Sequence, residues 1–343
     1  MSFRAVALGG GHGLHATLTA LRRVTDDVTA VVTVADDGGS SGRLRRELGL
    51  LPPGDLRKAM VALAGADPSS ALWATLFQHR FGGTGALAGH AVGNLVLAGL
   101  LEQLGDPVAV LEEAGRLLGV RGRVLPMCTE PLSIEADVTG LDDDADVVRR
   151  IRGQVAIATT PGRVQRIRLY GPGGPGEAPR GCAQAVEAVL AADVVVLGPG
   201  SWFTSVLPHL LVPELHDALV RTSARKVVVL NLVPQPGETD GFSPELHLDV
   251  LCEHAPALRV DAVIADVDAV PVPDRLRRAA AALGAAAHLA PIAVPGAPDR
   301  HDPTALASAV TRALAGPGDG TGGASSTTLQ EDRTSRGGEA PWR

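Results

Sequence analysis

Glycines cluster where the sequence predicts a phosphate-binding loop. Residues 9–14 read GGGHGL, between a short apolar run and leucines at helical spacing. Glycine lets backbone amides approach an anion, and a helix N-terminus adds a partial positive charge. The alternative interpretation is a tight strand-to-helix turn that binds nothing. The candidate ligand residues of this loop are Gly9, Gly10, Gly11, His12, Gly13 and Leu14.

Two adjacent acids follow the second apolar run, in the segment ADDGGSSGRLRRELG. Asp36 stands about 20 residues after the glycine loop, where a dinucleotide-binding fold places the acid that holds a ribose diol. Two carboxylates beside a pyrophosphate repel it unless a cation intervenes, so we expect Asp37 to hold Mg²⁺. Ser40 and Ser41 can donate to phosphate, and Arg43 can pair with it. An ordinary capped loop with solvated arginines is the alternative.

Four further segments carry candidate ligand residues. Arg57, in LPPGDLRKA, lies in a predicted first helical turn, where a cation opposes the helix dipole and could instead reach an anion. Asn94, in GHAVGNL, could recognise a base or a ribose, whereas His90 is better explained as a core histidine. The segment LGPGS provides Gly198, Gly200 and Ser201, and the segment NLVPQPGETDG provides Asn231. In this last segment Glu238 and Asp240 fit solvated loop acids better than metal ligands.

These segments follow apolar runs that predict a parallel sheet. Strands are expected at 3–8, 28–34, 193–197, 226–232, 260–266 and near 291–294. Continuous apolar strands separated by helical patterns are typical of an α/β fold with helices on both faces of a mostly parallel, Rossmann-like sheet. Residues 55–119 predict a helical segment. Residues 124–170 predict a small β-rich insertion in which QVAIATT and RVQRIRLY form a hairpin at Pro161-Gly162.

Composition limits the class of protein. The 343 residues are 45% hydrophobic and 20% charged, as in a soluble globular chain. A net charge of −7 and an aromatic content of 3% argue against a nucleic-acid-binding protein. Three cysteines without metal-ligand spacing, no secretory signal and no membrane-insertion segment predict a cytoplasmic protein. We expect one domain over residues 1–315 and a disordered tail over 316–343.

Taken together and in order, these motifs resemble the YvcK/CofD-like family. The resemblance covers residues 4–315 and implies a CofD-like fold and a bacterial regulatory protein, required for normal cell shape on gluconeogenic carbon sources. It also implies a nucleotide sugar as ligand, specifically a UDP-sugar such as UDP-N-acetylglucosamine. His12, Lys58 and His209 depart from the family pattern, in which Thr, Asn and Asn are usual.

The resemblance leaves more than one function open. A binding protein without turnover is the leading hypothesis, and it would act on a regulated enzyme of cell-wall precursor synthesis. A CofD-like Mg²⁺-dependent phospholactyl or nucleotidyl-type transferase is the first alternative, and an NAD(P)-binding oxidoreductase is the second. No catalytic residue is assigned, and a homo-oligomer is compatible with each hypothesis. The diphosphate is expected at Gly10, Gly11 and Gly13, with Gly200 and Ser201 across the crevice.

Overall fold

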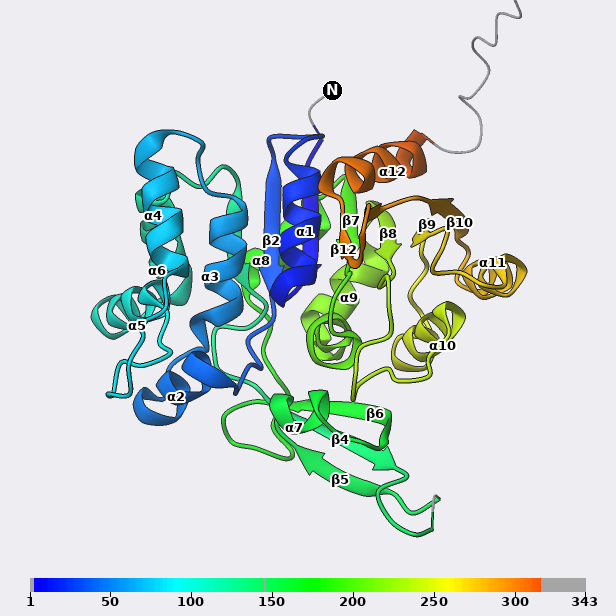
Figure 1. The fold of residues 1–343 in the computed structure, drawn as a ribbon, viewed down its shortest axis with the longest axis horizontal. Coiled ribbons are helices and arrows are strands. Elements are labelled where there is room, and N and C mark those ends of the chain that lie inside the picture. The colour runs from blue at the N-terminus through cyan, green and yellow to red at the C-terminus, as the bar shows by residue number, and fades with distance from the viewer. Residues whose placement is uncertain (1–2, 145, 316–343) are drawn as a thin grey trace, which may run out of the picture.

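A seven-stranded parallel sheet forms the centre of the molecule (Figure 1). The computed structural model describes residues 3–144 and 146–315, so the tail predicted beyond residue 315 lies outside the described residues. The spatial order of the strands is β10 (Ala286–Ala290), β9 (Ala262–Asp266), β8 (Arg225–Val229), β7 (Val194–Leu197), β1 (Ala5–Gly9), β2 (Val28–Val32) and β3 (Arg123–Pro126). The predicted α/β fold with a mostly parallel sheet is confirmed.

The direction of chain progression reverses at β1. From β1 the chain moves outward to β2 and β3, then returns to β7 on the other side of β1 and moves outward again. Right-handed crossovers therefore place the helices of the two halves on opposite faces of the sheet. In open α/β sheets, ligands bind beyond the carboxyl ends of the strands at such a reversal. The glycine loop after β1 and the loop after β7 flank this point.

Helices cover both faces. The helix α1 (Gly11–Leu21) packs beside α3 (Pro53–Ala62) and α12 (Pro303–Ala315), and α8 (Ala183–Ala191) packs against α9 (Pro213–Arg221). The helices α10 (Pro244–His254) and α11 (Pro273–Ala282) connect the last strands. No helix within the described ranges is both long and apolar enough to cross a membrane.

The predicted helical segment is present between β2 and β3. It consists of α2 (Gly39–Leu48), α3, α4 (Pro68–Gln78), α5 (Val92–Leu104) and α6 (Pro107–Leu117). Local chemistry explains where two of these helices begin, because Asp67 and Asp106 each accept amide hydrogen bonds and each precedes a proline at the first helical position. His90 precedes α5, so it does not share a helical face with Asn94.

The β-rich insertion is smaller than predicted. Because β3 belongs to the main sheet, the insertion contains only the antiparallel strands β5 (Arg149–Arg152), β4 (Ser133–Thr139) and β6 (Arg163–Tyr170) and the short helix α7 (Gln154–Ala158). Figure 1 shows it as a separate layer at the carboxyl edge of the main sheet. The predicted hairpin partner QVAIATT is wrong, since most of it forms α7.

The last predicted strand is present but lies outside the main sheet. Residues of PIAV form β11 (Ala293–Val294), which pairs with β12 (Ala297–His301) in a small hairpin. The last strand of the main sheet is β10, whose alanine-rich sequence AAHLA has no β-branched residue. Its strand conformation comes from parallel pairing with β9 rather than from local propensity.

Candidate functional site

The glycine loop forms the N-terminus of α1. Gly10 occupies the N-cap position without a side-chain hydrogen bond. Gly11 has φ +61°, and a Cβ added to it would have no described neighbour within 4 Å. The first amides of α1 therefore have no capping side chain and face open space at Gly11. A helix end of this kind can accept an anion.

Two other glycines allow close packing inside the protein. A Cβ on Gly13 would lie 2.1 Å from the carbonyl oxygen of Pro199, in the loop after β7. A Cβ on Gly10 would lie 2.5 Å from Asp55 Oδ2. The structure thus brings the two predicted glycine loops into contact, as expected of segments that flank the reversal point. Leu14 lies in the core, 1% exposed, and its amide donates to the carbonyl oxygen of Gly10.

The loop after β7 is held by side chains from the next loop. The amide of Gly200 donates to Asn231 Oδ1 at 2.8 Å, and Asn231 Nδ2 donates to the carbonyl oxygen of Gly200 at 2.9 Å. Gly198 packs inward, and its carbonyl oxygen accepts from Thr17 Oγ1 at 2.7 Å. Asn231 therefore positions Gly200 beside α1.

Glu238 is buried, although the sequence suggested a solvated acid. It is 3% exposed and accepts hydrogen bonds from the amides of Phe203 and Thr204 and from the hydroxyl of Ser201. Burial raises the pKa of this carboxyl group, and the hydrogen bonds from Ser201 and the two amides oppose that rise. The Ser201 hydroxyl is thus engaged inside the protein.

Three adjoining cavities follow the carboxyl edge of the sheet. The cationic cavity, of about 630 Å³, contains six predicted ligand residues, Asp36, Ser40, Ser41, Arg43, Arg57 and Asn94. The bridging cavity, of about 400 Å³, shares Arg57, Lys58 and Arg80 with it. The loop cavity, of about 670 Å³, shares His12 and His15 with the bridging cavity and contains the predicted residues Gly13, Gly200 and Asn231.

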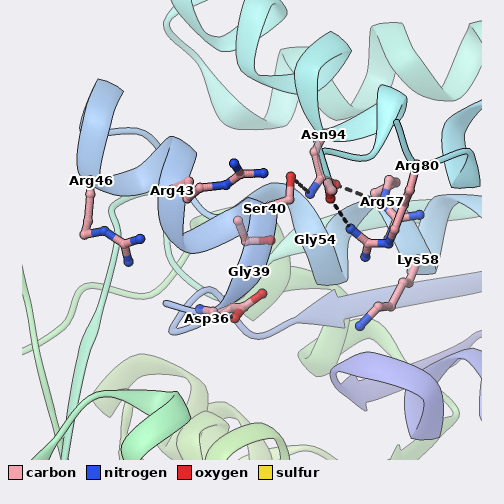
Figure 2. Close-up of a pocket in the computed structure, with 13 residues that line it drawn as sticks. Asp36, Gly39, Ser40, Arg43, Arg46, Gly54, Arg57, Lys58, Arg80 and Asn94 are labelled. Atoms are coloured by element: carbon pink, nitrogen blue, oxygen red, sulfur yellow. Dashed lines mark hydrogen bonds between the residues drawn. The ribbon is translucent and has the colours of Figure 1, made fainter. Parts of the chain in front are cut away.

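A hydrogen-bond network connects the cationic cavity to its supporting helices (Figure 2). Arg57 Nε donates to Asn94 Oδ1 at 2.8 Å, and Asn94 Nδ2 donates to Ser40 Oγ at 3.0 Å. Ser40 Oγ is also 2.9 Å from His90 Nδ1. Asn94 is 1% exposed, so its amide fixes Arg57 and Ser40 in position.

Gly93 explains how this network fits together. A Cβ at that position would lie 2.6 Å from the Phe77 ring and 2.9 Å from Arg57 Cδ. Phe77 and Arg57 therefore approach the helix closely at Gly93, which only glycine permits.

The two adjacent acids lie in different environments. Asp36 lines the cationic cavity and accepts from the amide of Gly38 at 2.9 Å. Burial and the neighbouring Asp55 raise the pKa of Asp36. Asp55 itself pairs with Lys58, whose Nζ is 3.1 Å from Asp55 Oδ1.

Asp37 caps the insertion helix α7. Its two carboxylate oxygens accept from the amides of Gln154 at 3.0 Å and Val155 at 2.9 Å. Gly153 makes room for it, because a Cβ there would lie 2.5 Å from Asp37 Oδ2. Within the described part of the chain, no group of three or more His, Cys, Asp or Glu side chains is arranged to hold a metal ion. The Mg²⁺ role of Asp37 stays a prediction.

Replacing Asp37 with alanine distinguishes a role in capping α7 from a role in binding Mg²⁺. If the cap is the main role, Asp37→Ala lowers the free energy of unfolding by about 1 kcal/mol, equally with and without Mg²⁺. Urea unfolding measures this, with the exposed acid variant Asp26→Ala as the control. A loss seen only when Mg²⁺ is present would instead make Asp37 a metal ligand.

Sequence reasoning missed several residues that the fold brings to these cavities. Arg80 comes from the exposed loop between α4 and α5, Gln235 comes from the loop after β8, and Arg300 and His301 come from β12. None of these four residues belongs to a local sequence motif that predicts a binding site. Lys58, which the sequence singles out only as a departure from the family pattern, lines two of the cavities.

Comparison with known proteins assigns the family. The family model described as 2-phospho-L-lactate transferase CofD matches residues 5–294. The chain belongs to the CofD family. This CofD-family protein is also 62% identical over 306 residues, 88% of each chain, to a Mycobacterium tuberculosis protein named "Putative gluconeogenesis factor". It is 37% identical over 270 residues, 79% of this chain and 80% of the other, to a Bacillus subtilis protein named "Gluconeogenesis factor".

A solved structure has the same fold. The CofD-family protein superposes on the crystal structure of a UPF0052 family member, BH3568 from Bacillus halodurans, with a TM-score of 0.79. The match has 34% sequence identity and covers 91% of this chain and 99% of the other. The seven-stranded architecture is therefore shared with that relative.

Proposed function

We propose that this protein binds a nucleotide sugar, in particular a UDP-sugar such as UDP-N-acetylglucosamine, and regulates cell-wall precursor synthesis and cell shape during growth on gluconeogenic carbon. The observation that carries the proposal is the uncapped N-terminus of α1 at the reversal point of the sheet, between two cavities. The diphosphate would lie at the amides of Gly11 and His12. Arg57, which lines the adjoining cavity, supplies positive charge.

The loop cavity offers a place for the nucleoside. Gln235 Oε1 and His301 Nε2 are buried beside it and have no hydrogen-bond partner among the described residues. Both residues line the cavity, together with Asn231 and Arg300, so polar side chains surround the space proposed for the nucleoside. Uracil carries both an N–H donor and carbonyl acceptors. Asp36, which the sequence suggested for the ribose diol, lies in the cationic cavity. In this arrangement it does not hold the ribose.

The test is a comparison of ligands by calorimetry with the full chain. UDP-N-acetylglucosamine is expected to bind more tightly than GTP and NAD, because the loop cavity presents polar atoms suited to uracil. Tighter binding of NAD would support the oxidoreductase hypothesis instead. Equal binding of UDP-N-acetylglucosamine and GTP would contradict the placement of the base beside Gln235.

The family match favours one alternative function, a CofD-like transferase. Adjoining cavities could hold a donor and an acceptor, and Mg²⁺ would assist such a transfer. Among the described residues that line the three cavities, however, histidines are the only aromatic side chains, which leaves no large ring to stack on a deazaflavin. Incubation with labelled UDP-sugar, followed by separation of bound and converted material, decides between binding and turnover.

A further inference from the structure

The cationic cavity has an unusual charge balance. Arg43, Arg46, Arg57, Lys58 and Arg80 line it, and Asp36 is the one acid among its described lining residues. Figure 2 shows Arg43 and Arg46 on one side of the cavity and the other three cations on the opposite side. The whole chain carries a net charge of −7, so this concentration of positive charge is local.

Neutral acceptors hold three of these arginines in place. Arg43 Nη2 donates to the carbonyl oxygen of Ala88 at 2.6 Å, and Arg80 Nη1 donates to that of Gly89 at 2.8 Å. Arg46 Nη1 donates to the carbonyl oxygen of Asp37 at 3.3 Å. A carbonyl group orients a guanidinium group without neutralising it. Within the described ranges none of the three lies in an ion pair with a carboxylate.

Arg57 is buried, and it too has only neutral hydrogen-bond partners. It is 2% exposed, and its partners Asn94, Gln78 and the carbonyl oxygen of Phe77 are all neutral. Burial, followed by the charge of Arg80, lowers the pKa of Arg57 to about 10, which leaves it protonated at neutral pH. A buried cation without a counter-ion is costly, and an anion bound beside it would offset that cost.

Further donors line the same cavity. The helix α2 begins at Gly39 without a capping side chain, and the hydroxyl-bearing residues Ser40 and Ser41 form its first turn. Guanidinium groups and helix amides together are donors that proteins use for phosphate, and the Ser40 hydroxyl is engaged with Asn94 and His90. By contrast, the lysine of the cavity, Lys58, is already paired with Asp55.

We propose that the cationic cavity binds a second small ligand, a phosphorylated metabolite, alongside the nucleotide sugar. The cavity volume of about 630 Å³ accommodates a small phosphate ester. Among the described residues it shares none with the lining of the loop cavity, in which we place the nucleoside, and it shares Arg57, Lys58 and Arg80 with the bridging cavity. The side formed by Arg43, Arg46 and the start of α2 lines neither of the other two cavities, so a phosphate bound on that side can be present together with the nucleotide sugar. This site stands on its own contacts and does not depend on the nucleotide-sugar proposal.

Calorimetry with inorganic phosphate at constant ionic strength tests the site. The variants Arg43→Gln and Arg80→Gln each remove one guanidinium group whose neutral partner is a loop carbonyl. Because a charged hydrogen bond is lost, each is expected to weaken phosphate binding about ten-fold or more. The matched control is Arg278→Gln, an exposed arginine on α11 that lines none of these cavities and is expected to bind phosphate as the parent does.

A second titration, with saturating UDP-N-acetylglucosamine present, tests whether the sites are separate. Phosphate affinity should stay within about two-fold of its value without the nucleotide sugar. Displacement of phosphate by UDP-N-acetylglucosamine would overturn the proposal, because the cavity would then be the diphosphate site. The proposal would also be overturned if Arg43→Gln and Arg80→Gln weaken phosphate binding no more than Arg278→Gln does. If phosphate binds through these arginines and UDP-N-acetylglucosamine does not bind, the second site stands and the nucleotide-sugar proposal fails.

Discussion

Gly13→Ala is expected to lower the free energy of unfolding by about 2 to 3 kcal/mol, because the added methyl group overlaps backbone that cannot move freely. The new Cβ would lie 2.1 Å from the carbonyl oxygen of Pro199 and 2.6 Å from the Cα of Gly200. Asn231 holds that loop by two hydrogen bonds, so α1 and the β7 loop must separate. UDP-N-acetylglucosamine affinity should fall at least ten-fold, since the helix amides are displaced. Urea unfolding and calorimetry measure the two effects.

Gly11→Leu is the matched variant. Its side chain would point into open space, so the stability cost is only that of a left-handed backbone at φ +61°, about 1 kcal/mol. We expect it to remove nucleotide-sugar binding while keeping the fold, because it fills the space in front of the α1 amides. If Gly11→Leu binds like the parent, the diphosphate does not lie at this loop. If Gly13→Ala is no less stable than Gly11→Leu, the loop after β7 is more adaptable than the structure indicates.

His209 is expected to make the protein sensitive to acid. Its side chain is 0% exposed, and its two ring nitrogens face the carbonyl oxygens of Val206 and Val31 at 3.3 and 3.1 Å. Burial lowers the pKa of His209 to about 4 from 6.5. Since the unfolded chain binds this proton more readily, stability is complete above pH 6.5 and falls as the pH drops towards 4.

The variant His209→Asn removes this titration. Between pH 7.5 and pH 4.5, the parent should lose about 2 to 3 kcal/mol more unfolding free energy than the variant. Asparagine suits the site because its amide can still donate to one of the two carbonyl groups. Other buried histidines, such as His247, contribute equally to both proteins and cancel in the difference. Parallel pH profiles for the two proteins would show that His209 is not the group concerned.

The sequence by itself determined five of the seven strands of the main sheet and the two glycine loops. Continuous apolar runs identified β1, β2, β7, β8 and β9, because continuous burial on both faces requires such runs. The motifs also predict Gly13 and Gly200 on facing sides of one crevice, and the reversal at β1 brings the loops after β1 and β7 together in that way. The resemblance to CofD-like proteins, carried by the same motifs, agrees with the family match.

Only the tertiary structure decided what the polar side chains do. Asp36 and Asp37 are adjacent in sequence but do different things. Asp37 caps α7 through the amides of Gln154 and Val155, which lie 117 and 118 positions further along the chain, whereas Asp36 lines the cationic cavity. The segment QVAIA that this long-range cap stabilises is a helix, although its local pattern suits a strand. Arg80 joins Arg43 and Arg57 because three segments converge on one cavity. Hydrogen-bond partners and burial depend on such non-local packing, which hydrophobic periodicity along the chain does not record.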